Sequence, residues 1–249
     1  MEVPHGLITA LKNTRKVLVL TGAGMSAESG VPTFRDAQTG LWQKYRAEDL
    51  ATPEAFRDHP GLVWDWYAQR RDNIRKVKPH AGHYALVEME QYFDAFTLVT
   101  QNVDSLHQQA GSSNVVELHG NIMRSICSET GKIIDDEWIK SNPGQPPVSP
   151  HHRRGLARPG VVWFGEQLPA DAMSRALSEA LSCDVCFSIG TSTLVQPAAS
   201  LPFTALDAGA TVIEINPTPT SLSSAANFVL QATAADALTM IAAELRSCS

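Results

Sequence analysis

Short apolar runs alternate with helix-like stretches along most of the chain. The apolar runs predict strands at residues 17–20, 96–100, 115–118, 185–189, 211–215 and 228–230. Amphipathic stretches between them predict helices, including 81–91, 171–182 and 236–246. This alternation predicts an α/β fold, a Rossmann-like parallel sheet with helices on both faces. Ligands of such sheets bind beyond the carboxyl ends of the strands, so residues following the runs should share one crevice. They include Gly22, Gln101, His119, Gly190 and Asn216.

Two segments interrupt the alternation. Residues 37–79 are rich in Trp and Arg and look helical, with Thr52-Pro53-Glu54 as a helix start. Residues 121–159 carry few periodic signals, and prolines make 141–150 a loop. We interpret the two segments as a small inserted module. The Rossmann-like domain would then comprise residues 1–36, 80–120 and 160–249.

Composition narrows the class of protein. The 249 residues are 43% hydrophobic and 18% charged, as in ordinary soluble domains. A net charge of −6 argues against a general nucleic-acid binder, so the basic residues at 151–154 are interpreted as a solvated loop. No apolar run is long enough for a membrane span. The first residues lack a signal-peptide pattern, and we expect a cytoplasmic protein.

Four cysteines occur in the sequence. Cys183 and Cys186 have the C-x-x-C spacing of zinc or redox sites. They lie in a predicted strand, where free cysteine packs as a small core residue. A redox pair would be expected at a helix N-terminus, so we predict that this pair is structural.

One segment carries most of the chemical information. Residues 20–36 read LTGAGMSAESGVPTFRD and follow the first predicted strand. A strand that ends in glycines and feeds a helix presents backbone N–H groups to a diphosphate. Gly22 suits a tight turn and Gly24 a close backbone approach. The third glycine of the common dinucleotide fingerprint is missing at its usual spacing.

Four later segments extend this motif: TQNVDSLH at 100–107, ELHG at 117–120, VVWFGE at 161–166 and GTS at 190–192. In this order, the five resemble the motifs of the sirtuin family of NAD-dependent protein deacylases. The resemblance implies NAD as co-substrate and acylated lysine side chains of proteins as substrates. Free lysine, nicotinamide and O-acyl-ADP-ribose would be the products. An unrelated Rossmann-like domain, a mono-ADP-ribosyltransferase and a non-catalytic NAD sensor are the alternatives.

The resemblance also implies residue roles. His119 would be the general base, since imidazole titrates near neutral pH, and Asn102 would assist catalysis. Phe34 would shield the reactive ribose carbon, and Arg35 would lie near phosphate. Capping of a following helix is the alternative role for Asn102 and Asp104. The implied NAD-binding residues are Gly22, Ala23, Gly24, Ser26, Ala27, Pro32, Phe34, Arg35, Gln101, Asn102, Asp104, Gly190, Thr191, Ser192, Asn216 and Ala234.

The substrate peptide would pair with the backbone of residues 161–166, interpreted as a β-rich strand, in a β-augmentation mode. Val195 would flank the peptide on its other side. The implied contacts are Val162, Trp163, Phe164, Gly165, Glu166 and Val195.

The chain also carries a feature of one sirtuin class. Tyr67 and Arg70 are three residues apart, so a helix would place them on one face. The resemblance implies that this pair binds the carboxylate of succinyl, malonyl or glutaryl groups, with Ala51 leaving room. We therefore expect a deacylase that prefers acidic acyl groups. A plain deacetylase, with Arg70 solvated beside a core Tyr67, is the alternative.

Many sirtuins hold zinc with four cysteines in the small module, and this chain departs from them. Cys127 is followed by Thr130 in place of the second cysteine of the first pair. The second cysteine pair would fall near Pro150 and Arg153, neither of which can bind zinc. Structural zinc normally takes four ligands, so we expect no bound metal. The adjacent His151 and His152 are the remaining candidate ligands. The module would instead be held by packing of Ile126, Ile133, Ile134, Trp138 and Ile139.

Overall fold

The computed structural model describes residues 3–32 and 45–247. A six-stranded sheet forms its larger part, with neighbouring strands all parallel and ordered β3-β2-β1-β7-β8-β9. The strand order reverses beside β1, so β1 and β7 flank the switch point where such sheets bind ligands. The strands are β1 (Lys16–Thr21), β2 (Ala95–Thr100), β3 (Val115–Glu117), β7 (Val185–Ile189), β8 (Thr211–Ile215) and β9 (Phe228–Leu230). They confirm the expected fold class, with ends that differ by at most one residue from those predicted.

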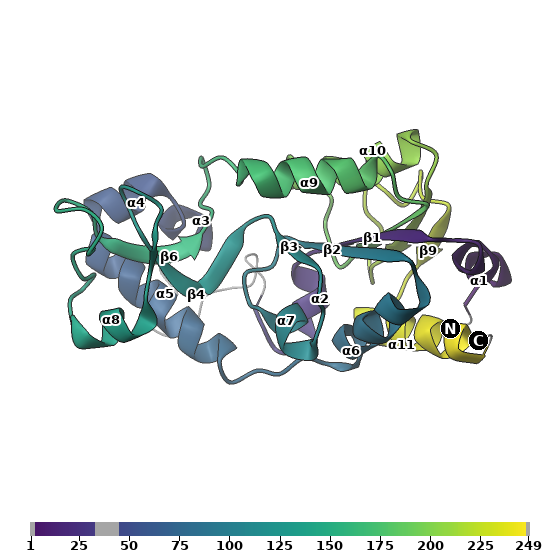
Figure 1. Cartoon of the computed structure of the whole chain (residues 1–249), viewed down its shortest axis with the longest axis horizontal. Coiled ribbons are helices and arrows are strands. Elements are labelled where there is room, and N and C mark those ends of the chain that lie inside the picture. The colour runs from purple at the N-terminus through teal and green to yellow at the C-terminus, as the bar shows by residue number, and fades with distance from the viewer. Residues whose placement is uncertain (1–2, 33–44, 248–249) are drawn as a thin grey trace.

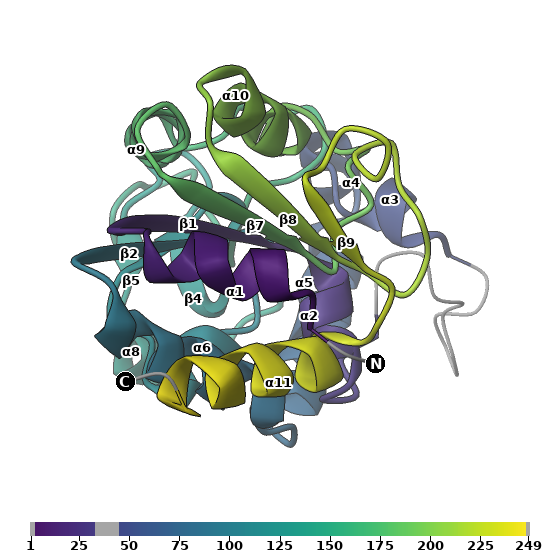
Figure 2. The same cartoon turned by 90° about the vertical axis from the view of Figure 1, so that its right-hand side faces the viewer.

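Helices cover both faces of this sheet (Figure 2). Along β1, Val17 and Val19 pack into one core and Leu18 and Leu20 into the other, because successive side chains point to opposite faces. The first core includes α1 (His5–Lys12), α6 (Ala81–Met89) and α11 (Ala234–Ser247). The second includes α9 (Ala170–Ala180) and α10 (Leu201–Asp207). Shorter helical segments are α2 (Ala23–Ala27), η2 (Glu90–Tyr92), α7 (Leu106–Ala110) and η3 (Ala198–Ser200).

A small module lies at one end of the molecule (Figure 1). Its antiparallel sheet has the order β5-β4-β6. The strands are β4 (Gly120–Cys127), β5 (Ile133–Ile134) and β6 (Ala157–Val161), and the helices are α3 (Ala47–Leu50), α4 (Pro53–Asp58), α5 (Pro60–Ile74) and α8 (Asp136–Ser141). Thr52 caps α4 by accepting from the Ala55 N–H at 3.1 Å, which confirms the predicted helix start. One apolar cluster joins residues of α5, β4 and β6, although the division of the chain into domains stays a prediction.

The strand expected at residues 161–166 is largely wrong. Strand β6 ends at Val161, and Gly165, at φ +87°, lies in a turn closed by a 3.0 Å bond from the Glu166 N–H to the Trp163 oxygen. The strand begins earlier, at Ala157, and includes Pro159. An edge strand tolerates proline because one side of its backbone has no partner strand, and β6 is at the edge of its sheet.

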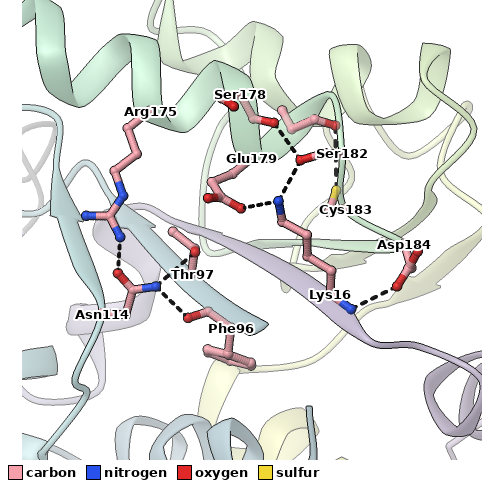
Figure 3. Close-up of polar contacts among 11 residues, drawn as sticks. Lys16, Phe96, Thr97, Asn114, Arg175, Ser178, Glu179, Ser182, Cys183 and Asp184 are labelled. Atoms are coloured by element: carbon pink, nitrogen blue, oxygen red, sulfur yellow. Dashed lines mark hydrogen bonds and ion pairs between the residues drawn. The ribbon is translucent and has the colours of Figure 1, made fainter. Parts of the chain in front are cut away.

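Polar contacts tie the amino-terminal edge of the large sheet to its helices (Figure 3). The Lys16 ammonium pairs with the Glu179 carboxylate of α9 at 3.0 Å, and the Asn114 amide donates to the Phe96 oxygen at 2.9 Å. Arg175 of α9 donates to Asn114. A cavity of about 750 Å³ at this edge includes Lys16, Asn114 and Glu179 in its lining. None of the helices in the described ranges is long and apolar enough to cross a membrane.

Candidate active site

Two glycine loops meet at the switch point. The Gly24 N–H, in the loop after β1, donates to the Gly190 oxygen, in the loop after β7, at 2.8 Å. A Cβ on Gly24 would lie 2.7 Å from Gly190 Cα, and one on Gly190 would lie 2.4 Å from Met25 N. Gly190 also has φ +59°, a conformation that favours glycine. The close approach therefore requires glycine at both positions.

Helix α2 begins directly after Gly22, and no side chain in the described part of the chain caps it. In its first turn, the Gly24 N–H donates to the Gly190 oxygen at 2.8 Å and the Met25 N–H to the Gly22 oxygen at 2.9 Å. A diphosphate bound at this helix start therefore stays a prediction from the glycine motif.

Asn102 joins the loop after β2 to the first glycine loop. Its amide donates to the Gly22 oxygen at 2.9 Å and to Ser26 Oγ at 3.0 Å. The Asp104 side chain has a different partner, because its carboxylate accepts from the N–H of Leu106, the first residue of α7, at 3.0 Å. Burial raises the pKa of Asp104, although hydrogen bonds from Leu106 and Ser26 oppose the rise. The capping alternative is thus found at Asp104, whereas the Asn102 side chain bonds the glycine loop.

His119 lies between β3 and β4, and one of its ring nitrogens makes a hydrogen bond within the protein. Its Nδ1 is 2.9 Å from the Gln101 oxygen. A carbonyl oxygen can only accept, so Nδ1 carries the hydrogen and Nε2 keeps its lone pair. Burial lowers the pKa of His119, while the bond to Gln101 acts in the opposite direction. The imidazole is therefore neutral at pH 7 and able to accept a proton at Nε2.

Backbone and side-chain bonds connect His119 to the other motifs. The Gln101 amide donates to Thr191 Oγ1 at 3.1 Å, and the Val162 N–H donates to the His119 oxygen at 2.9 Å. Together with the Asn102 contacts, these bonds bring all five sequence motifs into one network. The description of the chain does not extend to Phe34 and Arg35.

The remaining predicted cofactor residues differ in their exposure and contacts. The Asn216 amide donates to the Thr218 oxygen at 2.6 Å, and Ala234 is buried at the start of α11. Ser192 is half-buried in the loop after β7. Ala23, Ala27 and Pro32 are exposed in or after α2.

The predicted acyl-pocket residues converge on one apolar cluster. Ala51 and Tyr67 are both 2% exposed and share it with Trp163. The Trp163 indole Nε1–H donates to the Tyr67 oxygen at 3.0 Å, and the Phe164 N–H donates to the Ala51 oxygen at 2.9 Å. Burial raises the pKa of Tyr67 and lowers that of Arg70. The electrostatic interaction between the two side chains opposes both shifts, which places them near each other.

The predicted peptide-contacting residues divide into two kinds. Phe164 and Val195 are 48% and 41% exposed and so available to a partner. The Glu166 carboxylate is instead occupied by Arg158, at 2.6 and 2.9 Å, and by the Trp163 N–H at 2.8 Å. Arg158 is a residue that the sequence analysis missed, because no motif of charge or spacing marks it.

The environment of Cys127 does not fit a zinc site. Among the described residues, no group of three or more His, Cys, Asp or Glu side chains is placed to hold a metal ion. Burial raises the pKa of Cys127, but hydrogen bonds, chiefly those with the Ser149 and Thr130 side chains, outweigh it and leave the pKa lowered. His151 Nε2 contacts the Ile133 oxygen at 2.8 Å. Hydroxyl groups thus surround the one remaining thiol, while zinc content itself stays a prediction.

The other cysteine pair lies in the core. Cys183 and Cys186 are free, buried thiols packed with α9 and α10. Burial raises the pKa of Cys183 to about 11 and also raises that of Cys186. A raised pKa disfavours the reactive thiolate, in agreement with a packing role.

A second feature missed from the sequence is a set of buried histidines behind the glycine loops. His83 and His107 have ring centroids 5.0 Å apart, and His107 Nε2 lies 3.0 Å from Thr21 Oγ1. His80 Nε2 is 2.7 Å from the Met25 oxygen in α2. The H-x-x-H spacing at residues 80 and 83 was the available signal.

Comparison with known proteins decides the family. Residues 22–197 match the sequence model of the Sir2 family. The chain belongs to the Sir2 family. It is 50% identical over 213 residues to an NAD-dependent protein deacylase of Aquifex aeolicus, covering 85% of this chain and 87% of that protein. A relative of the same name from Ralstonia nicotianae is 49% identical over 221 residues, 88% of each chain.

Solved structures agree with this Sir2 assignment. A Sir2 homologue–NAD complex superposes with a TM-score of 0.90 at 40% identity, covering 99% of this chain and 95% of that one. A Sir2 structure with a deacetylated p53 peptide and 3′-O-acetyl ADP-ribose has a TM-score of 0.84 at 28% identity, covering 98% of both chains. The Sir2 chain described here is accordingly an NAD-dependent protein deacylase with NAD as its co-substrate.

Proposed function

We propose that this deacylase removes acidic acyl groups, such as succinyl, malonyl and glutaryl, from protein lysines in preference to acetyl. The observation that carries the proposal is the position of Tyr67 and Arg70 three residues apart on α5, with Tyr67 in one apolar cluster with Ala51 and Trp163. An acyl chain that ends in a carboxylate needs charge-assisted donors, and a guanidinium with a phenol supplies them. An acetyl group has no carboxylate to use them.

The protonation states suit this role. Burial keeps the Tyr67 proton in place at neutral pH because it raises the pKa of the phenol. The phenol is therefore a hydrogen-bond donor. Arg70 remains a cation even with its pKa lowered, since an arginine begins far above neutral pH. Both groups can therefore donate to a carboxylate that enters the cluster.

His119 is the proposed general base. NAD, when bound, would supply an electrophilic ribose carbon, to which the acyl oxygen bonds as nicotinamide leaves. His119 Nε2 would accept the proton of a ribose hydroxyl, because Nδ1 is held by the Gln101 oxygen. The glycine loops and Asn102 hold the diphosphate and ribose in place, and the turn at residues 162–166 aligns the peptide.

The test compares kcat/KM for one peptide carrying either succinyl-lysine or acetyl-lysine. We expect the succinyl form to react faster by tenfold or more, because a charge-assisted contact contributes roughly 1.5–3 kcal/mol. Mass spectrometry should detect O-succinyl-ADP-ribose. Arg70→Met should remove most of the advantage, and Tyr67→Phe a smaller part of it.

Arg75→Met provides the matched control. Arg75 follows the last turn of the same helix, is exposed, and pairs with Asp72 at 3.0 Å. Its loss should leave the succinyl-to-acetyl ratio unchanged. Equal losses of both activities in Arg70→Met would show that Arg70 is structural, and a plain deacetylase would then be the better description.

A further inference from the structure

The indole of Trp163 reaches the proposed acyl pocket from the protein interior. Its Nε1–H donates to the Tyr67 oxygen at 3.0 Å, and both side chains are almost fully buried. A phenol oxygen carries one hydrogen and accepts through its remaining lone pairs. A donor that arrives from Trp163 therefore excludes the phenol hydrogen from that side. The hydrogen of Tyr67 is left to point away from the indole.

The indole is itself held in place by an ion pair. The Arg158 guanidinium bonds both oxygens of Glu166, at 2.6 and 2.9 Å, and donates to the Val161 oxygen at 2.9 Å. Its central carbon lies 3.3 Å from the centroid of the Trp163 ring. Glu166 also accepts from the Trp163 backbone N–H. The pair thus fixes Trp163 both at its ring face and at its backbone.

Two further contacts hold Trp163 and its neighbour Phe164 in place. The Phe56 ring packs against Trp163 with centroids 5.2 Å apart. The next residue, Phe164, is anchored to the Ala51 oxygen. The turn that carries Trp163 therefore contacts both the predicted peptide side and the α5 residues that would bind the acyl group.

We propose that Trp163 is a positioning residue for acyl selectivity, whose indole N–H orients the Tyr67 hydroxyl toward an acidic acyl group bound at Arg70. The Arg158–Glu166 pair acts through Trp163 by fixing the orientation of the indole ring. This inference rests on the proposed acidic-acyl preference. The inference adds to the proposed pocket a residue that does not touch the acyl carboxylate, and a partly buried ion pair that supports this residue.

The decisive experiment is a double-mutant cycle with Trp163→Phe and Tyr67→Phe, read as the succinyl-to-acetyl ratio of kcat/KM. The ratio cancels differences in the amount of folded enzyme. Trp163→Phe should lower it between about twofold and tenfold, the range for one neutral hydrogen bond. The change should appear mainly as a higher KM for the succinyl peptide, since the contact is remote from the bonds that react. In the Tyr67→Phe background, Trp163→Phe should lower the ratio little further.

Trp64→Phe is the matched control. Trp64 lies on α5 and, like Trp163, has an arginine over its ring, with Arg71 5.4 Å from the ring centroid. It packs in a different apolar cluster from Trp163. It should leave the ratio unchanged. If Trp163→Phe does not fold, Glu166→Gln weakens the same support and should lower the ratio in the same Tyr67-dependent way.

The outcomes separate this inference from the proposed function. A wild-type succinyl preference that Arg70→Met removes, with a ratio unchanged in Trp163→Phe or lowered equally in both Tyr67 backgrounds, overturns the role of Trp163 alone. A wild-type enzyme without succinyl preference overturns both proposals. A ratio lowered only when Tyr67 is present supports both.

Discussion

At the scale of single residues, His119 shows how one hydrogen bond assigns a chemical role. The Gln101 oxygen holds the hydrogen on Nδ1, and this leaves Nε2 as the basic nitrogen. Burial lowers the pKa of His119, so the free base is populated at neutral pH. The same side chain would be a weaker base if its tautomer were not fixed.

We expect His119→Ala to lose about 10²–10⁴-fold in kcat, the usual contribution of a general base, while NAD binding is retained. Steady-state rates and calorimetric NAD titration measure the two effects. His5→Ala, at the exposed start of α1, should change neither. Near-normal turnover of the His119 variant would refute the assignment.

At the scale of elements, the small sheet shows which side chains pack together inside its module. Strand β5 contains two isoleucines with opposite environments, because neighbouring residues of a strand face opposite sides. Ile134 is 2% exposed and packs with Cys127 and Ala157, whereas Ile133 is 63% exposed. The expected packing role of Ile133 is therefore wrong. Trp138 and Ile139 do join this cluster, and Ile126 is only half-buried.

Ile134→Ala should lower the free energy of unfolding by about 2–5 kcal/mol, as for other buried isoleucines. The adjacent Ile133→Ala should change it by no more than about 0.5 kcal/mol, because little apolar surface is lost from the core. Urea denaturation of the two variants gives the comparison. Equal effects would contradict the packing described for β5.

The packing of this module also leads to an expectation about zinc. If packing supports the module, a chelator should leave the melting temperature of the wild-type protein unchanged, and elemental analysis should find no stoichiometric metal. One zinc per chain would overturn this expectation and implicate Cys127 with His151 or His152.

At the scale of the whole molecule, the buried histidines link stability to pH. Burial, with the neighbouring histidines, lowers the pKa of His83 to about 2 and that of His107, next to His80, to about 3. In the unfolded chain both titrate near 6.5. Between these values the unfolded state binds more protons, so stability is complete above about pH 6.5 and falls as the pH is lowered.

We therefore expect the free energy of unfolding to decrease by up to about 1.4 kcal/mol per pH unit for each of these histidines between pH 6 and 4. His107→Gln keeps a donor for Thr21 but cannot titrate, so its stability should depend less steeply on pH. Urea unfolding at several pH values measures both slopes. An unchanged slope in the variant would show that His107 is protonated in the folded protein.

Much of the fold was predictable because its signals are local. Short apolar runs placed the six strands of the large sheet, amphipathic patterns placed α6, α9 and α11, and Thr52-Pro53 marked the start of α4. The glycine motifs predicted the crevice, since strand ends in a parallel sheet meet at one edge. Strand β6 was misplaced because Pro159 and Gly160 are poor strand formers, tolerated here at a sheet edge.

The sequence by itself determined the α/β class, the motifs that mark a Sir2 deacylase and the candidate residues Tyr67, Arg70 and His119. Only the tertiary structure decided their partners. The hydrogen on His119 depends on Gln101, the orientation of Tyr67 on Trp163, and the exposure of Ile133 on how β5 packs. Local patterns encode elements because backbone preferences act over a few residues. Hydrogen-bond partners come from segments far apart in the sequence, as with Tyr67 and Trp163, and are fixed only when those segments pack together.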